Sequence, residues 1–335
     1  METNGDVAIK VVPVRHVGRW FGLAGVALFI AMLVHTTLYK VASAEKTCLT
    51  VDGVKTCHGV LVWRFQWNIV GKYFLSSEVL HGLLVTIELT VISMIIGIVL
   101  GMVVAIMRMS PSRILAGVAW TYTWFFRGTP VLVQITFWAF IGALYPHVSI
   151  GIPFTHIAFA HINVDLSLTT LDAVIIGLGL NEGAYMSEIA RAGLISVDEG
   201  QIEAATSLGM TRRQTLRLVV IPQAMRVIIP PTGNEVISML KTTSLASTVG
   251  VLELFGAVTN ISATNFKIIP LLTVASIWYL IVTTVLSIGQ YYLERRFARG
   301  ALRTPPPTPI QRLKNDLRGI ASKFRTRRGI IEVAT

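Results

Sequence analysis

The chain has 335 residues, of which 53% are hydrophobic and only 14% are charged, and its formal net charge is +11. A soluble domain usually has about 25% charged residues. The composition therefore excludes an ordinary soluble domain and predicts an all-α integral membrane protein, built as a polytopic helical bundle.

Six membrane spans are predicted along the chain. Three are uninterrupted apolar runs that reach the about 20 residues a helix needs to cross a bilayer, at residues 20–39, 82–107 and 268–293. Three more contain glycine, proline or charged residues, at 114–145, 168–192 and 223–250. The first span is expected to be a retained anchor, because its apolar run is longer than that of a usual cleaved signal peptide.

The distribution of Lys and Arg predicts the orientation of these spans. When six spans alternate, most of the 29 basic residues fall on one side, and such an excess marks the cytoplasmic side of a membrane. Both termini are therefore expected in the cytoplasm. The net charge is interpreted as a topology signal, not as a sign of nucleic-acid binding.

Three regions follow from this topology. Residues 1–81 hold a cytoplasmic N-terminus, the extra anchor span and an extracytoplasmic loop. Residues 82–294 form a five-span core, and residues 295–335 form a Pro-rich, basic cytoplasmic tail. Within the tail, residues 311–328 fit either a basic amphipathic helix lying on anionic lipid or a solvated charged segment.

The predicted outside loops contain both cysteines and a group of histidines. Cys48 and Cys57 follow the first span, where a disulfide is expected and two free thiols are the alternative. His147, His156 and His161 lie in a later loop without acidic partners at ligand spacing. They are interpreted as isolated loop histidines, and no metal site is predicted.

The third predicted span is broken by the sequence Arg127-Gly128-Thr129-Pro130. Irregular backbone at membrane depth is tolerated only where it is buried in protein or lines a cavity. Gly128 and Pro130 are therefore expected to shape a structural break. Arg127 is expected to be structural as well, satisfying carbonyls that the break leaves free.

Polar residues gather in the fifth predicted span, after Pro230 and Pro231. Polar groups inside a membrane are costly and normally face a bundle interior or a pathway. The candidates for a solute pathway are Asn234, Glu235, Lys241, Thr243 and Ser244, with Glu88 and Glu182 as pathway acids from other spans. For each of them, hydrogen bonding between helices is the alternative.

Residues 196–222 predict two helices joined by a glycine turn, between the fourth and fifth spans. Two pairs of residues fit a capping box at a helix start: Ser196 with Glu199, and Thr211 with Gln214. Gly209 is expected in a left-handed turn, and Pro222 is expected to limit the second helix. A DNA-binding helix-turn-helix is excluded because both ends continue directly into membrane spans. A merely connecting loop would need only a few residues.

The segment contains Glu203-Ala204-Ala205, then Gly209, and then Val219-Val220-Ile221-Pro222. In these residues and their spacing it resembles the EAA loop of ABC importer permeases. The resemblance implies that residues 196–222, the coupling loop, dock on a separate ATPase. Glu203, Ala204, Ala205 and Gly209 would form the docking surface. Arg212, Arg213 and Arg217 would pair with acidic groups of the ATPase, with simple solvation as an equal alternative.

Further motifs are similar to those of polar amino acid permeases, the group that carries histidine, glutamine, glutamate or arginine. They include Phe126-Arg127-Gly128-Thr129-Pro130 with Gln134, and Gly233-Asn234-Glu235. The likeness covers about residues 82–300 and departs from the first 81 residues and the tail. Glu188 and Arg191, three apart on a helix, are expected to form an ion pair that braces the coupling loop, with a substrate role as the alternative.

The resemblance implies a type I importer core of five spans plus one extra N-terminal span, in the bacterial cytoplasmic membrane. Its expected partners are an ATPase dimer that holds ATP and Mg²⁺, an extracytoplasmic amino acid-binding protein, and a second permease subunit, identical or homologous. This chain is expected to bind no cofactor and to be no enzyme, because no catalytic motif is visible.

Two alternatives to amino acid transport stay open on the sequence. One is a non-transporting membrane scaffold or signalling protein that docks an ATPase. The other keeps the transport mechanism with an amino acid derivative or a short peptide as the solute.

Overall fold

The computed structural model describes residues 17–51, 54–63, 65–144, 147–151, 158–163 and 169–297. The chain divides into two units, Met1–Ser76 with Ser262–Val274 and Ser77–Ile261 with Ala275–Thr335. The helices α11 (Leu254–Asn265) and α12 (Ile268–Phe297) contribute residues to both units.

The first unit contains α1 (Val17–Leu38), the strands β1 (Lys40–Val51) and β2 (Val54–Trp63), and α2 (Trp67–Phe74). α1 coincides with the first predicted span. β1 and β2 form an antiparallel hairpin whose register places Cys48 opposite Cys57. Directly opposed residues of antiparallel strands have Cα atoms about 4.5–5.5 Å apart, a separation that a disulfide can bridge. The register is therefore compatible with the disulfide, which stays a prediction.

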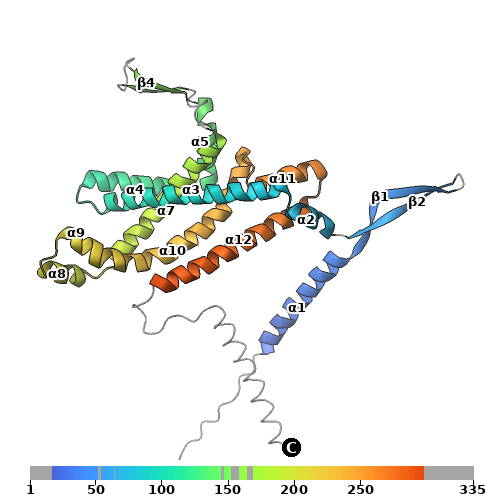
Figure 1. Ribbon diagram of the computed structural model, residues 1–335, viewed down its shortest axis with the longest axis horizontal. Coiled ribbons are helices and arrows are strands. Elements are labelled where there is room, and N and C mark those ends of the chain that lie inside the picture. The colour runs from blue at the N-terminus through green and yellow to red at the C-terminus, as the bar shows by residue number, and fades with distance from the viewer. Residues whose placement is uncertain are drawn as a thin grey trace, which may run out of the picture. The chain divides into compact units, whose positions relative to one another are not determined.

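The second unit is a helical core. Its first helices are α3 (Ser77–Arg108), α4 (Arg113–Gly128), α5 (Val131–Leu144) and α7 (Thr170–Ile195). These are followed by α8 (Glu199–Ser207), α9 (Arg212–Thr215), a π-helical turn (Leu216–Val220), α10 (Ile221–Thr242) and a 3₁₀ segment (Thr243–Val249). In Figure 1, α3 and α4 lie along each other, and α7 runs from the end near α5 towards α8. The core is helical, as predicted.

Small residues let α3 pack closely along α7. A Cβ atom placed on Gly101 would lie 2.5 Å from Cβ of Met186, and one on Gly179 would lie 2.8 Å from Cγ2 of Ile96. Such contacts are closer than side chains allow, so glycine at these positions sets the distance between the helices. Leu89, Leu178 and other buried apolar side chains of α3, α5, α7 and α10 fill the space beside this contact.

A second antiparallel hairpin lies between α5 and α7, formed by β3 (His147–Gly151) and β4 (Ala158–Asn163). Like β1 and β2, it falls in a predicted outside loop and not in the helical core. His147 and His161 belong to these strands. His156 and the predicted tail helix at 311–328 lie outside the described residues.

Fewer spans can be recognised among the described helices than the six predicted. α3 and α12 are each long and apolar enough to cross a membrane, and residues 212–249 with α11 form a third candidate that bends by 44°. The third predicted span is divided into α4 and α5, which have 16 and 14 residues and are each shorter than a full span. α7 has 26 residues, but acidic and other polar residues reduce its apolar character. The total of six stays a prediction.

Candidate functional site

The break between α4 and α5 is held by amide side chains. Thr129 is extended, as expected for the residue before a proline. The Phe126 carbonyl accepts hydrogen bonds from Nε2 of Gln134 and Nδ2 of Asn181, both at 2.9 Å. Gln134 also donates to the carbonyl and hydroxyl oxygens of Thr129. Two amides thus satisfy the oxygens at the break, and the expectation that Arg127 does so is wrong.

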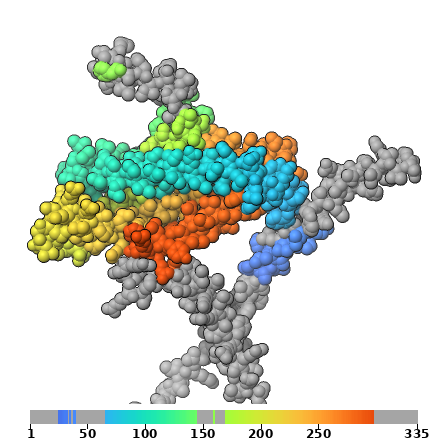
Figure 2. Space-filling view, in the orientation of Figure 1, coloured from blue at the N-terminus to red at the C-terminus, as the bar shows by residue number. Residues whose placement is uncertain are grey.

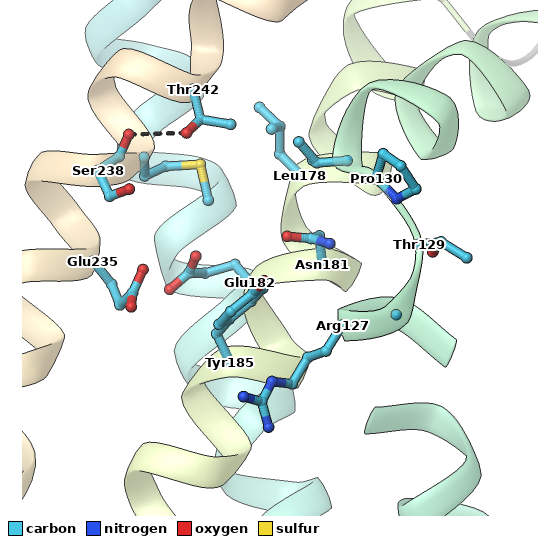
Figure 3. A pocket seen from close by; sticks show the side chains of 13 residues that line it. Arg127, Thr129, Pro130, Leu178, Asn181, Glu182, Tyr185, Glu235, Ser238 and Thr242 are labelled. Carbon is cyan, nitrogen blue, oxygen red and sulfur yellow. Dashed lines mark hydrogen bonds between the residues drawn. The ribbon is translucent and has the colours of Figure 1, made fainter. Parts of the chain in front are cut away.

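A cavity of about 510 Å³ adjoins this break. Its walls come from the α4–α5 break, from α7 and from α10. The polar side chains that line it include Asn181, Glu182 and Tyr185 of α7 and Glu235, Ser238 and Thr242 of α10. Figure 3 shows the carboxylates of Glu182 and Glu235, the acid pair, turned towards each other from these two helices. A volume of this size lies within the range of small-molecule sites in proteins.

Glu182 is the more deeply placed member of the acid pair. Its side chain is 4% exposed, and its Oε1 atom has no hydrogen-bond partner among the described residues. It also packs on α3, because a Cβ on Gly97 would lie 2.4 Å from Cγ of Glu182. Neither acid of the pair forms an ion pair with a described residue. The acid pair therefore offers acceptors that no described cation pairs with, since Arg127 of the same cavity contacts Glu188 instead, and it favours a proton or a cationic ligand.

The other predicted pathway residues do not line this cavity. Asn234 is exposed and its Oδ1 accepts a hydrogen bond from Gln290 of α12 at 3.1 Å, which is the helix–helix alternative. The hydroxyls of Thr243 and Ser244 donate to backbone carbonyls one turn earlier, at 2.7 Å. Glu88 and Lys241 are exposed on α3 and α10. Of the seven candidates, the structure brings together Glu182 and Glu235.

Four polar lining residues of α7 and α10 were missed on the sequence: Asn181, Tyr185, Ser238 and Thr242. A signal was available in their spacing. Tyr185 follows Asn181 by four residues, and Thr242 follows Glu235 by seven, so each set lies on one face of its helix. The sequence argument considered single polar residues and did not compare helical faces.

Glu188 forms the centre of a charged cluster on the side of the cavity nearer the coupling loop. Its Oε2 accepts hydrogen bonds from Nε and Nη2 of Arg191 at 3.0 and 2.8 Å, which confirms the predicted ion pair. Its Oε1 lies 3.8 Å from guanidinium nitrogens of both Arg108 and Arg127. We call Arg108, Arg127 and Arg191 the arginine cluster. They come from three helices and share one carboxylate.

The coupling loop has the predicted helix, turn and helix, with one different cap. Asp198 caps α8 by accepting from the Gly200 N–H at 2.8 Å, whereas Ser196 ends α7, so the predicted Ser196–Glu199 box is wrong. Asp198 directly precedes α8, and its short side chain brings a carboxylate oxygen to the backbone N–H groups of the first turn. The Thr211–Gln214 box is confirmed. Gly209 has a φ of +76°, the left-handed turn predicted for it.

Most of the predicted docking residues are exposed. Glu203, Ala204, Gly209, Arg212 and Arg213 all face outward, and Figure 2 shows the loop (yellow) protruding at one end of the helical core. Ala205 is different, because it is 4% exposed. It supports α8 from inside and is not available as a docking surface. Leu208, which was not predicted, is 82% exposed at the tip beside Gly209.

Pro222 was expected to limit the second helix, but it does not. It stands at the first turn of α10, directly after the π-helical turn, where the Ile221 N–H bonds to the Leu216 carbonyl. A π-helical turn is wider than an α-helical one, and it accommodates a proline that would otherwise clash with the carbonyl four residues earlier. The helical path is therefore continuous from Arg212 to Thr242, and it joins the coupling loop to Glu235.

Comparisons with known proteins agree with this arrangement. Residues 97–299 match the family model of the binding-protein-dependent transport system inner membrane component. The arginine transport system permease protein ArgU of Corynebacterium glutamicum is 42% identical over 88% of this chain and 85% of its own length. The glutamine transport system permease protein GlnP of Escherichia coli is 33% identical over 70% and 98%. A solved amino acid ABC transporter with histidines is 31% identical over 68% of this chain and 98% of that chain, with a TM-score of 0.58.

Proposed function

This chain belongs to the family of binding-protein-dependent transport system inner membrane components, and we propose that its acidic cavity binds an amino acid on its way across the membrane. The chain is a permease subunit of an amino acid ABC importer, like the relatives to which it is similar. Two carboxylates that face one cavity and form no ion pair with a described residue are the observation that carries the proposal.

The solute we propose is an amino acid with a cationic side chain. The acid pair offers acceptors for an ammonium or guanidinium group, and such bonds to charged groups are stronger than neutral ones. The relative with 42% identity is named for arginine transport, and the solved relative contains histidines. The cavity volume of about 510 Å³ is ample for one amino acid.

ATP-driven motion would reach the cavity through the coupling loop. We propose that the exposed face of Glu203, Ala204, Gly209, Arg212 and Arg213 docks on a separate ATPase, with Leu208 inserted as an apolar anchor. The continuous helical path from Arg212 to Thr242 supports this, because a displacement of the loop would move the wall that carries Glu235. Alternating access then follows as the two sides of the cavity open in turn.

The assembly proposed around this chain has further parts. ATP and Mg²⁺ are held by a dimer of the ATPase, and an extracytoplasmic binding protein delivers the amino acid. A second permease subunit, identical or homologous, completes the route. Both termini of this chain lie in the cytoplasm, and the chain itself binds no cofactor.

The test is uptake by the complete reconstituted importer in vesicles. Glu235→Gln should lower arginine uptake by about tenfold or more, because a hydrogen bond to a charged group contributes about 1.5–3 kcal/mol. Glutamine uptake, if the importer accepts it, should change little. Glu88→Gln is the matched control, since Glu88 is exposed on α3 and does not line the cavity.

Equal losses of arginine and glutamine uptake in Glu235→Gln would contradict a cationic solute. Capture of the ATPase without any ATP-dependent accumulation of solute in the parent protein would instead favour the scaffold alternative.

A further inference from the structure

Beyond the cavity, α7 carries a second charged group. Glu182 belongs to the acid pair, and Glu188 with Arg191 follows within three helical turns, in the direction of α8. Arg127 lines the same cavity as the acid pair and also contacts Glu188. A solute that leaves the acid pair towards the coupling loop therefore meets the arginine cluster next.

The arginine cluster carries more positive charge than its carboxylate neutralises. Arg191 donates two short hydrogen bonds to Oε2 of Glu188. Arg108 and Arg127 each place a guanidinium nitrogen 3.8 Å from Oε1 of the same carboxylate. Three guanidinium groups, which stay protonated in proteins, thus face one carboxylate. The side chain of Arg127 is 45% exposed, so part of its charge is presented to the cavity.

Tyr185 fixes the direction in which Arg127 points. The guanidinium carbon lies 5.3 Å from the centre of the Tyr185 ring, a distance suited to a cation–π contact. In Figure 3 the ring of Tyr185 lies between the guanidinium of Arg127 and the acid pair. The guanidinium contacts Glu188 and forms no ion pair with Glu182 or Glu235, so the two charged regions remain separate.

We propose that the arginine cluster is an electrostatic barrier that keeps inorganic cations from leaking through the route. An acidic cavity concentrates sodium and potassium ions as well as a cationic amino acid. Positive charge in the adjoining wall repels a bare cation, as arginine does in selective pores. An amino acid differs because it also carries a carboxylate, which pairs with Arg127 on the way past. The inference rests on the proposed transport function of the same cavity.

The test measures potassium leak in vesicles that contain the complete importer, with binding protein and ATP present so that the route opens. Arg127→Gln should raise the potassium leak by about tenfold, because it removes one positive charge from the wall beside the path. Arg127→Lys keeps the charge and should leak as the parent protein does. Arg108→Gln provides a second, independent removal of charge from the cluster.

The sign of the charge separates a barrier from simple damage. Glu188→Gln disrupts the same cluster but leaves it more positive, so potassium leak should stay at the parent level while chloride leak rises. Arg113→Gln, at the exposed start of α4, is the control outside the cluster. A potassium leak in Glu188→Gln as large as in Arg127→Gln would overturn the proposal, and so would unchanged leak in both Arg127→Gln and Arg108→Gln. Solute uptake is measured in the same vesicles, so a parent protein without uptake would reject the transport function independently of these leak results.

Discussion

The coupling loop and the cavity differ in how their polar groups are satisfied. In the coupling loop, Asp198 and Thr211 cap their own helices through hydrogen bonds to residues two and three positions away. In the cavity, Glu182 is buried with one oxygen unpartnered among the described residues. The loop can therefore move as a preformed element, whereas the cavity is completed by something that enters it.

The largest effect is expected from a substitution that breaks the contact between the coupling loop and the ATPase. Glu203→Lys should abolish ATP-driven uptake while the protein remains folded and inserted, because the reversed charge opposes docking on an exposed face. Gln201→Lys places the same charge on another side of α8 and should retain most of the uptake. Copurification of the ATPase and vesicle uptake are measured together. Normal uptake in Glu203→Lys would remove the coupling role.

A smaller effect is expected from a single methyl group placed in the helix contact behind the cavity. Gly97→Ala introduces a Cβ atom 2.4 Å from Cγ of Glu182, so α3 and α7 must separate or Glu182 must shift. Overpacking of this kind costs about 1–3 kcal/mol. Gly289→Ala, where no atom lies within 4 Å of the added Cβ, should be neutral or slightly stabilising. Thermal unfolding in detergent compares the two, and equal midpoints would show that the contact is looser than described.

The smallest effect concerns the preformed state of the coupling loop. Thr211→Ala removes the cap of the second helix and should cost about 0.5–2 kcal/mol of local stability, whereas Thr211→Ser should retain the cap. Hydrogen exchange of the amides near residue 214 reports this directly. If the alanine variant exchanged no faster than the serine variant, the local capping bond would contribute nothing to the order of the loop.

The parts of the structure that depend on near neighbours could be predicted from the sequence. The Gly209 turn, the Thr211–Gln214 box and the Glu188–Arg191 pair each join residues a few positions apart, and all three are present. Residue type and spacing are sufficient to identify such features.

The parts that depend on distant segments could not be predicted in the same way. The meeting of Glu182 with Glu235 requires α7 and α10 to pack together, and the satisfaction of the Phe126 carbonyl requires Asn181 from another helix. The sequence argument expected Arg127 to satisfy the carbonyls freed at the break, whereas Gln134 and Asn181 do so. The π-helical turn was missed because it depends on which carbonyl each N–H selects, not on residue type alone.

Because of the wide turn at 216–220, the residues of α10 point in other directions around the helix axis than they would in a regular α-helix. Each residue of an α-helix turns its successor by about 100° and advances it by about 1.5 Å. The wide turn holds one more residue in about the same rotation, so regular winding with every residue kept would rotate everything beyond it by about that angle unless the tertiary packing resisted. Glu235 would then leave its place opposite Glu182, so the partnership of the two carboxylates depends on the width of one turn several turns away.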